Sequence, residues 1–177
     1  MNVTTLDALL IFLVAHKSQS GYDIRQLFQS TPLGVFSDSP GSIYPSLARL
    51  ERRGLLTSAV EPGGRRRRNY KRTAAGQKVL RAWLERPLEH DPRKRRNGEV
   101  ELRFVLIAED LGLTRAMRFL DEADAAFSAE LAELETFMAG PGGKMSEASR
   151  ATTELGMRLI RVHIDWCREM KKKLGRR

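Results

Sequence analysis

Cysteine is almost absent from this chain of 177 residues, which contains only one, Cys167. A single thiol cannot form an intrachain disulfide, so an apolar core has to hold the fold together. Hydrophobic residues make up 41% of the sequence, which is enough for such a core. A reducing cytoplasm is the compartment that suits this composition.

Long apolar runs are absent as well. The apolar stretch from Leu6 to Ala15 is too short to span a bilayer and is interrupted by Asp7. It also lacks the basic flank and the cleavage site of a signal peptide. We therefore expect no membrane association, and we interpret the stretch as a core helix.

The sequence also lacks the motifs of enzyme chemistry. The glycine-rich segment Gly140-Pro-Gly-Gly143 is not followed by the Lys-Ser/Thr pair of a phosphate-binding loop. There is no nucleophile elbow and no HExxH motif. Glu99 and Glu101 are two residues apart, which places them on different sides of a helix. The sequence therefore predicts neither catalysis nor a cofactor.

Positive charge is abundant, and it is unevenly distributed. The formal net charge is +9. Residues 1–90 carry 14 Lys and Arg against 7 Asp and Glu, whereas residues 91–177 carry 17 against 15. A polyanionic partner such as nucleic acid would explain an imbalance concentrated in one half. A generally basic composition without such a partner is the alternative.

The most informative stretch runs from Ser39 to Leu56. Pro45 would disrupt a helix that began at Ser39, but it is tolerated in the first turn of a helix capped by Ser42. Gly54 then supplies the stop. One face of this helix is apolar, with Ile43, Leu47 and Leu50, and the opposite face holds Pro45, Ala48, Arg49 and Arg52. This pattern is typical of a DNA recognition helix.

A basic hairpin is expected directly after this helix. The segment from Leu55 to Val60 has the pattern of a strand, Glu61 to Gly64 that of a turn, and Arg65 to Arg72 that of the returning strand. Four consecutive cations repel one another unless an anion such as a DNA phosphate lies nearby. A solvated basic loop remains the alternative. The four are Arg65, Arg66, Arg67 and Arg68.

Apolar periodicity predicts helices through most of the remaining chain. In the N-terminal half we expect helices over about residues 5–16 and 22–29, anchored in the second case by Tyr22, Leu27 and Phe28, and a helix capped by Thr73 that ends before Pro87. Val35 and Phe36 are expected to form an apolar plug in the intervening loop. The segment Pro87–Gly98 lacks periodicity and marks a domain boundary. Beyond it, we expect helices from Glu99, from about Thr114 as N-cap, and from Ser146 to about Leu174.

The last helix carries an unusually wide apolar surface. One neighbouring helix cannot cover both of its stripes, so we expect a second subunit to pack on it across a two-fold axis. The first stripe comprises Leu155, Leu159, Val162, Trp166 and Met170, and the second comprises Met157, Ile160, Ile164 and Cys167.

Taken together, four motifs resemble the PadR family of transcriptional regulators. They are Gly21-Tyr-Asp-Ile24, Ser39-Pro-Gly-Ser-Ile-Tyr-Pro45, Leu47-x-Arg49-Leu-Glu51-x-x-Gly54-Leu-Leu56 and Tyr70-x-x-Thr73-x-x-Gly76. The resemblance covers residues 6–84, and the chain length suits the subfamily with the larger C-terminal domain.

The resemblance implies a mainly α-helical protein with a small β-hairpin wing. Residues 1–86 would form a winged helix-turn-helix domain, 87–98 a linker, and 99–177 a helical dimerisation domain with a possible effector site. A homodimer would repress transcription from an inverted-repeat DNA operator, and a small aromatic or drug-like effector would release it. The family's DNA contacts carry over onto Ser42, Tyr44, Pro45 and the four wing arginines. From their place on the helix, Arg49 and Arg52 are further candidates for phosphate or guanine contacts.

The C-terminal half offers no clear effector or metal site. Phe104, His163 and Trp166 are aromatic residues that suit an aromatic ligand, but their spacing is equally explained by an interface core. His163 and Cys167 lie four residues apart and lack a third metal ligand, so no metal is expected.

Two other classes of function are compatible with the same sequence. A DNA-binding protein of architectural type would use the basic wing without reading sequence. An adaptor would use its winged helix to contact an acidic protein. Discrimination between an operator and shuffled DNA separates the first from a regulator, and lack of DNA affinity at moderate salt identifies the second.

The proposed recognition helix and wing should contribute differently to DNA binding. We expect Tyr44→Ala to abolish preference for an operator over shuffled DNA. Replacing the four wing arginines by alanine should weaken binding to all DNA and lower the salt slope by about 0.9 per lost phosphate contact. Fluorescence anisotropy with both DNAs over a salt series measures the two effects. An equal loss of discrimination in both variants would contradict this division of roles.

Overall fold

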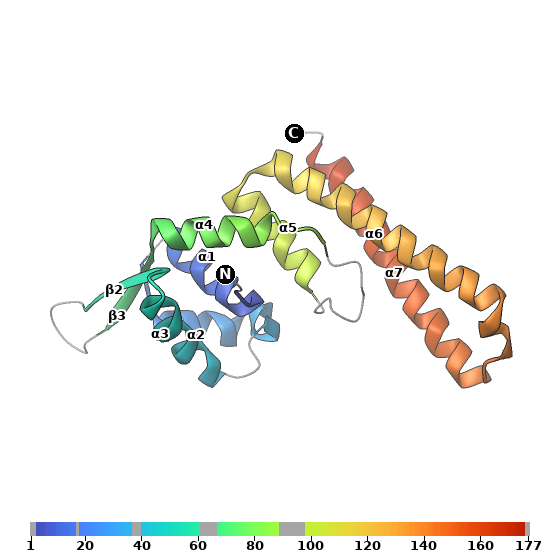
Figure 1. The fold of residues 1–177 in the computed structure, drawn as a ribbon, viewed down its shortest axis with the longest axis horizontal. Helices are drawn as coiled ribbons and strands as arrows, with labels where there is room; N and C mark the ends of the chain where they lie inside the picture. Colours follow the sequence, from blue (N-terminus) through green and yellow to red (C-terminus); the bar gives the residue numbers. More distant parts are fainter. Residues whose placement is uncertain (1–2, 17, 37–39, 61–66, 89–97, 176–177) are drawn as a thin grey trace. The chain divides into compact units, whose positions relative to one another are not determined.

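The computed structural model describes residues 3–16, 18–36, 40–60, 67–88 and 98–175. These residues form seven α-helices and one three-stranded antiparallel sheet, which confirms the expected mainly helical fold with a β wing (Figure 1). The chain divides into two compact units, Met1–Arg86 and Pro87–Arg177. No helix within the described ranges is long and apolar enough to cross a membrane.

Four helices build the first unit, and α1 lies at its centre. They are α1 (Thr5–His16), α2 (Gly21–Ser30), α3 (Ile43–Arg52) and α4 (Ala74–Leu84), with short 3-10 segments at Pro32–Phe36 and Pro40–Ser42. The repeat of Leu6, Leu9, Leu10 and Leu13 predicts one apolar face for α1, but Ala8 and Ile11 outside that face are also fully buried. The reason is that α3, α4 and strand β3 all pack on this helix.

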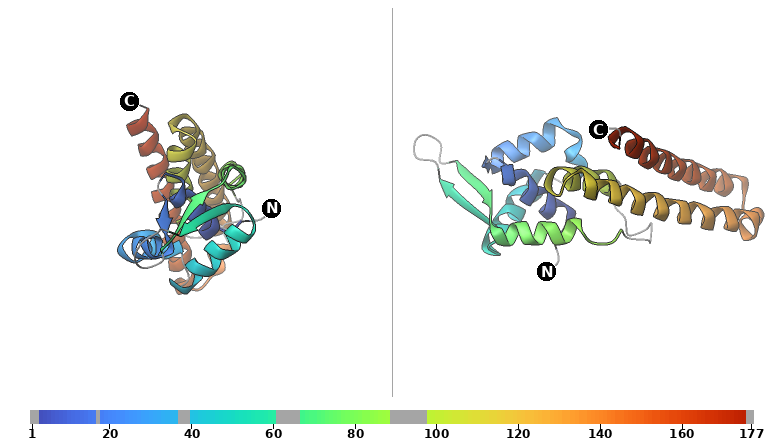
Figure 2. Two further views of the ribbon diagram at one scale, coloured as in Figure 1. Left: turned by 90° about the vertical axis from the view of Figure 1, so that its left-hand side faces the viewer. Right: turned by 90° about the horizontal axis from the view of Figure 1, so that it is seen from above.

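The wing is the hairpin that the sequence predicted, with one additional strand. Strands β2 (Leu56–Val60) and β3 (Arg68–Arg72) pair in antiparallel register, with Ser58 opposite Tyr70 (Figure 2). The short β1 (Gln19–Ser20) pairs with the other edge of β3 and was not expected, because two residues show no periodicity. Ser20 also caps α2, since its hydroxyl accepts the Asp23 N–H and its own N–H donates to the Asp23 carboxylate.

The backbone of Leu55 joins the end of α3, the start of the wing and the start of α4. Gly54 adopts φ +69° and ends α3 in a Schellman motif, in which the Leu55 N–H donates to the Leu50 carbonyl at 2.9 Å. The Leu55 carbonyl in turn accepts the Thr73 N–H at 3.2 Å. Thr73 caps α4 as predicted, because its hydroxyl accepts the Gly76 N–H.

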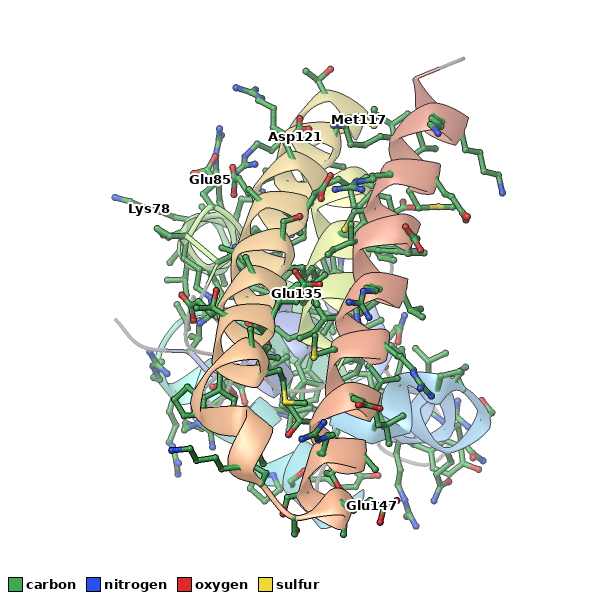
Figure 3. All side chains as sticks on the ribbon, turned by 90° about the vertical axis from the view of Figure 1, so that its right-hand side faces the viewer. Lys78, Glu85, Met117, Asp121, Glu135 and Glu147 are labelled. Atoms are coloured by element: carbon green, nitrogen blue, oxygen red, sulfur yellow. The ribbon has the colours of Figure 1, made fainter. Side chains whose placement is uncertain are left out.

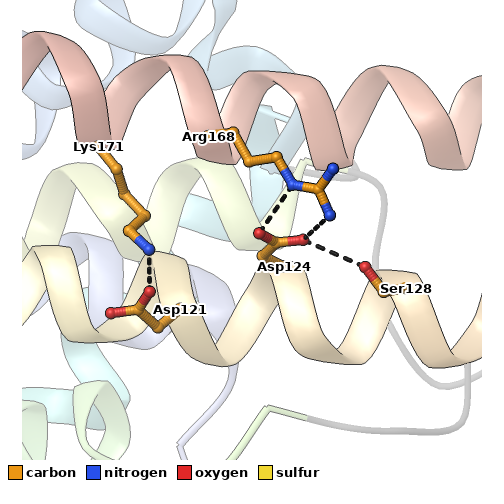
Figure 4. Close-up of polar contacts among 5 residues, drawn as sticks. All are labelled: Asp121, Asp124, Ser128, Arg168 and Lys171. Atoms are coloured by element: carbon orange, nitrogen blue, oxygen red, sulfur yellow. Dashed lines mark hydrogen bonds and ion pairs between the residues drawn. The ribbon is translucent and has the colours of Figure 1, made fainter.

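The second unit consists of α5 (Glu99–Asp110), α6 (Leu113–Ala139) and α7 (Glu147–Leu174). Helices α6 and α7 form a long hairpin joined by the 3-10 segment Pro141–Lys144, and Figure 3 shows them side by side. Side chains of α7 make ion pairs with α6 along the hairpin (Figure 4). They join Arg161 to Glu135, Arg168 to Asp124, and Lys171 to Asp121.

Three details of the sequence-based picture were wrong. Tyr22 was expected to be an apolar anchor, but it is 51% exposed and Ile24 is buried instead. Of the expected plug, Phe36 is buried as predicted, whereas Val35 is 68% exposed. Thr114 was expected to cap α6, yet the helix begins at Leu113. Gly112 takes the N-cap position with φ +89°, a left-handed conformation that lets the chain turn sharply from α5.

Gly76 leaves no room for a side chain, which yields a test of the junction. A Cβ atom at this position would lie 2.1 Å from the Leu55 carbonyl oxygen, and backbone cannot yield as a flexible side chain can. Gly76→Ala should therefore lower the free energy of unfolding by about 1–3 kcal/mol. The control is Gly156→Ala in α7, where nothing lies within 4 Å and alanine should stabilise by about 1 kcal/mol. Urea unfolding measures both, and equal effects of the two substitutions would contradict the model of the junction.

The ion pairs between α6 and α7 predict a pH dependence of stability. The pKa of the Asp124 carboxyl lies below its usual range, chiefly because Arg168 donates two hydrogen bonds of 3.0 Å to it. A lowered folded-state pKa stabilises the fold above the unfolded pKa of about 3.9, and this stability is lost as pH falls through the folded value. Asp124→Asn should lower the melting temperature at pH 7. The gap to the wild type should narrow as pH falls below about 4 and close once pH is below the folded pKa, and a gap that does not narrow would rule out the charge as its source.

Candidate nucleic-acid interface

Helix α3 presents a buried face and an exposed face, as the sequence predicted. Ile43, Leu47 and Leu50 are fully buried. Ser42 holds the N-cap position, so Pro45 falls in the first turn. Ser42 has helical backbone angles and makes no capping bond through its side chain, because the preceding 3-10 segment runs directly into α3. Pro45 and Arg52 are exposed, while Ser42, Ala48 and Arg49 are half-buried.

The Tyr44 ring lies against the start of α2. Tyr44 is 44% exposed, and a Cβ atom at Gly21 would lie 2.7 Å from its Cε1 atom. Any side chain at position 21 would therefore displace this ring. The contact explains why the motifs that contain Gly21 and Tyr44 occur together, although the two residues are far apart in the sequence. It gives Tyr44 a defined orientation at the surface.

A polar network connects α3 to the wing. The Ser58 hydroxyl donates to Glu51 Oε1 at 2.6 Å and accepts from Arg68 Nε at 2.7 Å. Arg68 Nη2 donates to the same Glu51 oxygen at 3.0 Å. Because the three residues come from α3, β2 and β3, the network sets the angle between the wing and the helix. The neighbouring Tyr70 is buried in the sheet, and burial raises the pKa of its phenol.

Two of the four wing arginines, Arg67 and Arg68, lie within the described residues. Arg67 lies over the ring of Tyr22, with its guanidinium carbon 5.9 Å from the ring centroid, within the range of a cation–π contact. Arg68 is 55% exposed despite its bond to Glu51. Arg65 and Arg66 lie outside the described residues. Tyr22 is therefore not a core residue, and its exposed ring instead contacts Arg67, which directly precedes β3.

Sequence reasoning missed the partner of Arg49. Arg49 Nη2 lies 2.6 Å from Asp7 Oδ1, and the Asp7 side chain is only 2% exposed. Asp7 also closes a capping box with Thr4 at the start of α1, since each backbone N–H donates to the other side chain at 3.1 Å. The Thr-x-x-Asp spacing was the signal that could have revealed this cap. The ion pair leaves a DNA contact by Arg49 as a prediction.

In the second unit, the aromatic residues considered for an effector take part in two ring contacts. The rings of Phe104 and Trp166 meet edge to face at 5.4 Å, and His163 stacks on Phe127 at 4.9 Å. His163 Nε2 lies 3.0 Å from the Glu101 carboxylate. Burial raises the pKa of the Cys167 thiol to about 12, so it stays protonated at neutral pH and is a poor metal ligand. Among the described residues, no group of three side chains is arranged to hold a metal ion.

Comparison with known structures finds bacterial regulators along most of the chain. Bacillus subtilis PadR in complex with operator DNA shares 21% identity over 96% of this chain and 99% of its own, with a TM-score of 0.46. The same protein in complex with p-coumaric acid gives 20% identity over 97% and 99% of the two chains, with a TM-score of 0.45. The PadR-like regulator BC1756 from Bacillus cereus gives 19% over 98% and 97%, with a TM-score of 0.45. No curated protein matches the chain.

The similarity to a named family comes from a family model that matches part of the chain. Residues 9–82 match the transcriptional regulator PadR-like family. They include the whole of α2, α3 and the wing, with Tyr44 on Gly21 and the network around Glu51. This is a family of transcriptional regulators and not of enzymes, in agreement with the sequence-based expectation. The chain thus carries a PadR-like transcriptional-regulator domain over residues 9–82, which are 74 of its 177 residues.

Proposed function

We propose that this PadR-like regulator is a dimeric repressor that binds an inverted-repeat operator. The observation that carries the proposal is the exposed face of α3, where Tyr44 is oriented by Gly21 and the wing is linked to the helix through Glu51. A helix can read a major groove only if its exposed side chains have a defined direction, and both contacts supply one.

The candidate DNA contacts divide by chemistry. Ser42, Tyr44 and Pro45 lie at the start of α3 and are small or flat enough to approach base edges. Arg49 and Arg52 are proposed to contact phosphates or guanine. The wing arginines, residues 65–68, are proposed to contact phosphates or a narrow minor groove, where cations are favoured without sequence readout.

A second copy of the chain is the proposed occupant of the exposed stripe on α7. Met157, Ile160 and Ile164 are buried, whereas the first three residues of the other stripe are exposed and its last two, Trp166 and Met170, are half-buried. A run of large apolar side chains on one face of a helix is typical of an interface. In that stripe, Leu155, Leu159 and Val162 are 55%, 54% and 63% exposed. We propose that residues 99–177 dimerise and that residues 1–86 bind DNA, with residues 87–98 as the linker.

Two-fold symmetry in the protein would require two-fold symmetry in the operator. A small aromatic or drug-like effector would release the operator only to the extent that it binds the two states of the dimer differently. The p-coumaric acid complex is a property of the Bacillus subtilis protein. Phe104 and Trp166, whose rings pack edge to face, are the candidates for contact with an aromatic ligand in this chain. Such a regulator would act in the cytoplasm.

Selection of DNA from a random-sequence library tests the function directly. Duplexes retained by the wild-type protein should share an inverted repeat whose half-sites lie about 10 base pairs apart, centre to centre. The selected site should be bound roughly a thousandfold more tightly than a shuffled copy. Retention of unrelated sequences would instead identify an architectural DNA-binding protein. No retention at moderate salt would point to a protein-binding adaptor.

The dimer proposal has its own test. Leu159→Glu places a charge in the exposed stripe of α7 and should convert the dimer to a monomer of 20.0 kDa, as measured by sedimentation equilibrium. The matched control is Leu113→Glu, which alters a leucine of similar exposure, 46%, at the start of α6 and should remain dimeric. The monomer should also lose affinity for the selected operator, because its two half-sites are no longer bound together. A dimeric Leu159→Glu variant would place the interface elsewhere.

A further inference from the structure

Asp7 and Arg49 form the most buried ion pair that reaches the proposed DNA-binding face. The Asp7 side chain is 2% exposed, whereas that of Arg49 is 41% exposed. The pair therefore joins the interior of the first unit to its surface. A buried carboxylate needs partners, and Asp7 has two: the Thr4 N–H at the start of α1 and Arg49 Nη2.

The geometry restrains the end of the Arg49 side chain. Nη2 donates to Asp7 at 2.6 Å and lies 3.1 Å from the hydroxyl of Ser46, which is 4% exposed. A long flexible side chain thus has its tip fixed by two groups that cannot move away, since one is built into the cap of α1 and the other into α3. The remaining exposed part is accessible to an anion. Arg52, one turn further along α3, has no ion-pair partner among the described residues.

We infer that Asp7 is a positioning residue that orders Arg49 for DNA before DNA arrives, and that it thereby raises specificity. The inference rests on the proposed function. Because the pair is electrically neutral overall, Asp7 reduces the attraction of Arg49 for phosphates in general. In return, Asp7 restrains the Arg49 side chain before binding, so the guanidinium can contact a correctly placed phosphate or base with little further loss of conformational entropy.

These two effects have opposite consequences for specific and non-specific DNA. Asp7→Asn keeps the shape of the side chain and an acceptor for the Thr4 N–H, but it removes the charge that holds Arg49. Affinity for the selected operator should then fall, because Arg49 has to be ordered on binding. Affinity for shuffled DNA should stay constant or rise, because the domain gains one net positive charge. A role in folding alone would lower both affinities together.

A double-mutant cycle tests the inference. Wild type, Asp7→Asn, Arg49→Gln and the double variant are titrated by fluorescence anisotropy against the selected operator and a shuffled copy over a salt series. Asp7→Asn should lower the operator preference by about tenfold, on the scale of one mismatched base pair. In the Arg49→Gln background the same change should have no further effect, because its target is absent. Arg52→Gln is the matched background, and there Asp7→Asn should keep its full effect.

Arg49→Lys is a second variant that tests the same inference if Asp7→Asn does not fold stably. It should retain the wild-type salt slope, since the charge remains, and lose operator preference, since an ammonium lacks the planar fork of a guanidinium. An unchanged preference in this variant, or an Asp7→Asn effect that persists without Arg49, would overturn the inference while leaving the proposed function intact. If the wild type shows no operator preference, the proposed function fails and the inference with it.

Discussion

The backbone at Leu55 is the constraint on which the first unit depends. Its N–H closes the end of α3 and its carbonyl accepts the Thr73 N–H at the start of α4, while the chain between them forms the wing. Only a residue without a Cβ fits beside that carbonyl, and Gly76 fills the place. Helix α3, the wing and α4 are thus held at one point. A winged helix needs this rigidity, because helix and wing have to meet DNA in a fixed relation.

Carboxylates play an unusual part in a surface proposed to bind a polyanion. Glu51 holds Arg68 at the start of β3, and Asp7 holds Arg49 on α3. Each lowers the net positive potential that attracts DNA of any sequence. Each also fixes a guanidinium whose freedom would otherwise be lost on binding. A cluster of untethered arginines would bind more tightly to all DNA but distinguish less well between sequences.

The two sides of α7 differ in what they contact. One side packs on α6, with Met157 and Ile164 buried and ion pairs such as Arg168 with Asp124 along the border. On the other side, the apolar residues Leu155, Leu159 and Val162 remain exposed. Exposed ion pairs contribute little stability each, so the apolar contact holds the hairpin and the charges chiefly fix the register of the two helices. The stripe left open is the natural place for a second copy.

Much of this architecture follows from local chemistry that the sequence displays. Caps and stops are encoded within a few residues, so the limits of α1, α3, α4 and α7 and the existence of the wing could be predicted closely. The motif containing Tyr44 likewise located helix α3, whose role in reading DNA stays a prediction. Apolar periodicity also located the two stripes of α7 and indicated that one neighbouring helix cannot cover both, and Leu155, Leu159 and Val162 are indeed exposed.

Contacts between distant segments were decided by the tertiary structure alone. Ser20 joins the sheet only because β3 passes beside it, Gly21 is required only because the Tyr44 ring packs on it, and Tyr22 is exposed beneath the wing. From the sequence, Asp7 was interpreted only as a charge that interrupts an apolar run, whereas in the structure it is the buried partner of Arg49. The physical reason is common to all four: periodicity and capping report the chain's own neighbours, whereas these roles depend on which other segment the fold brings within a few ångströms.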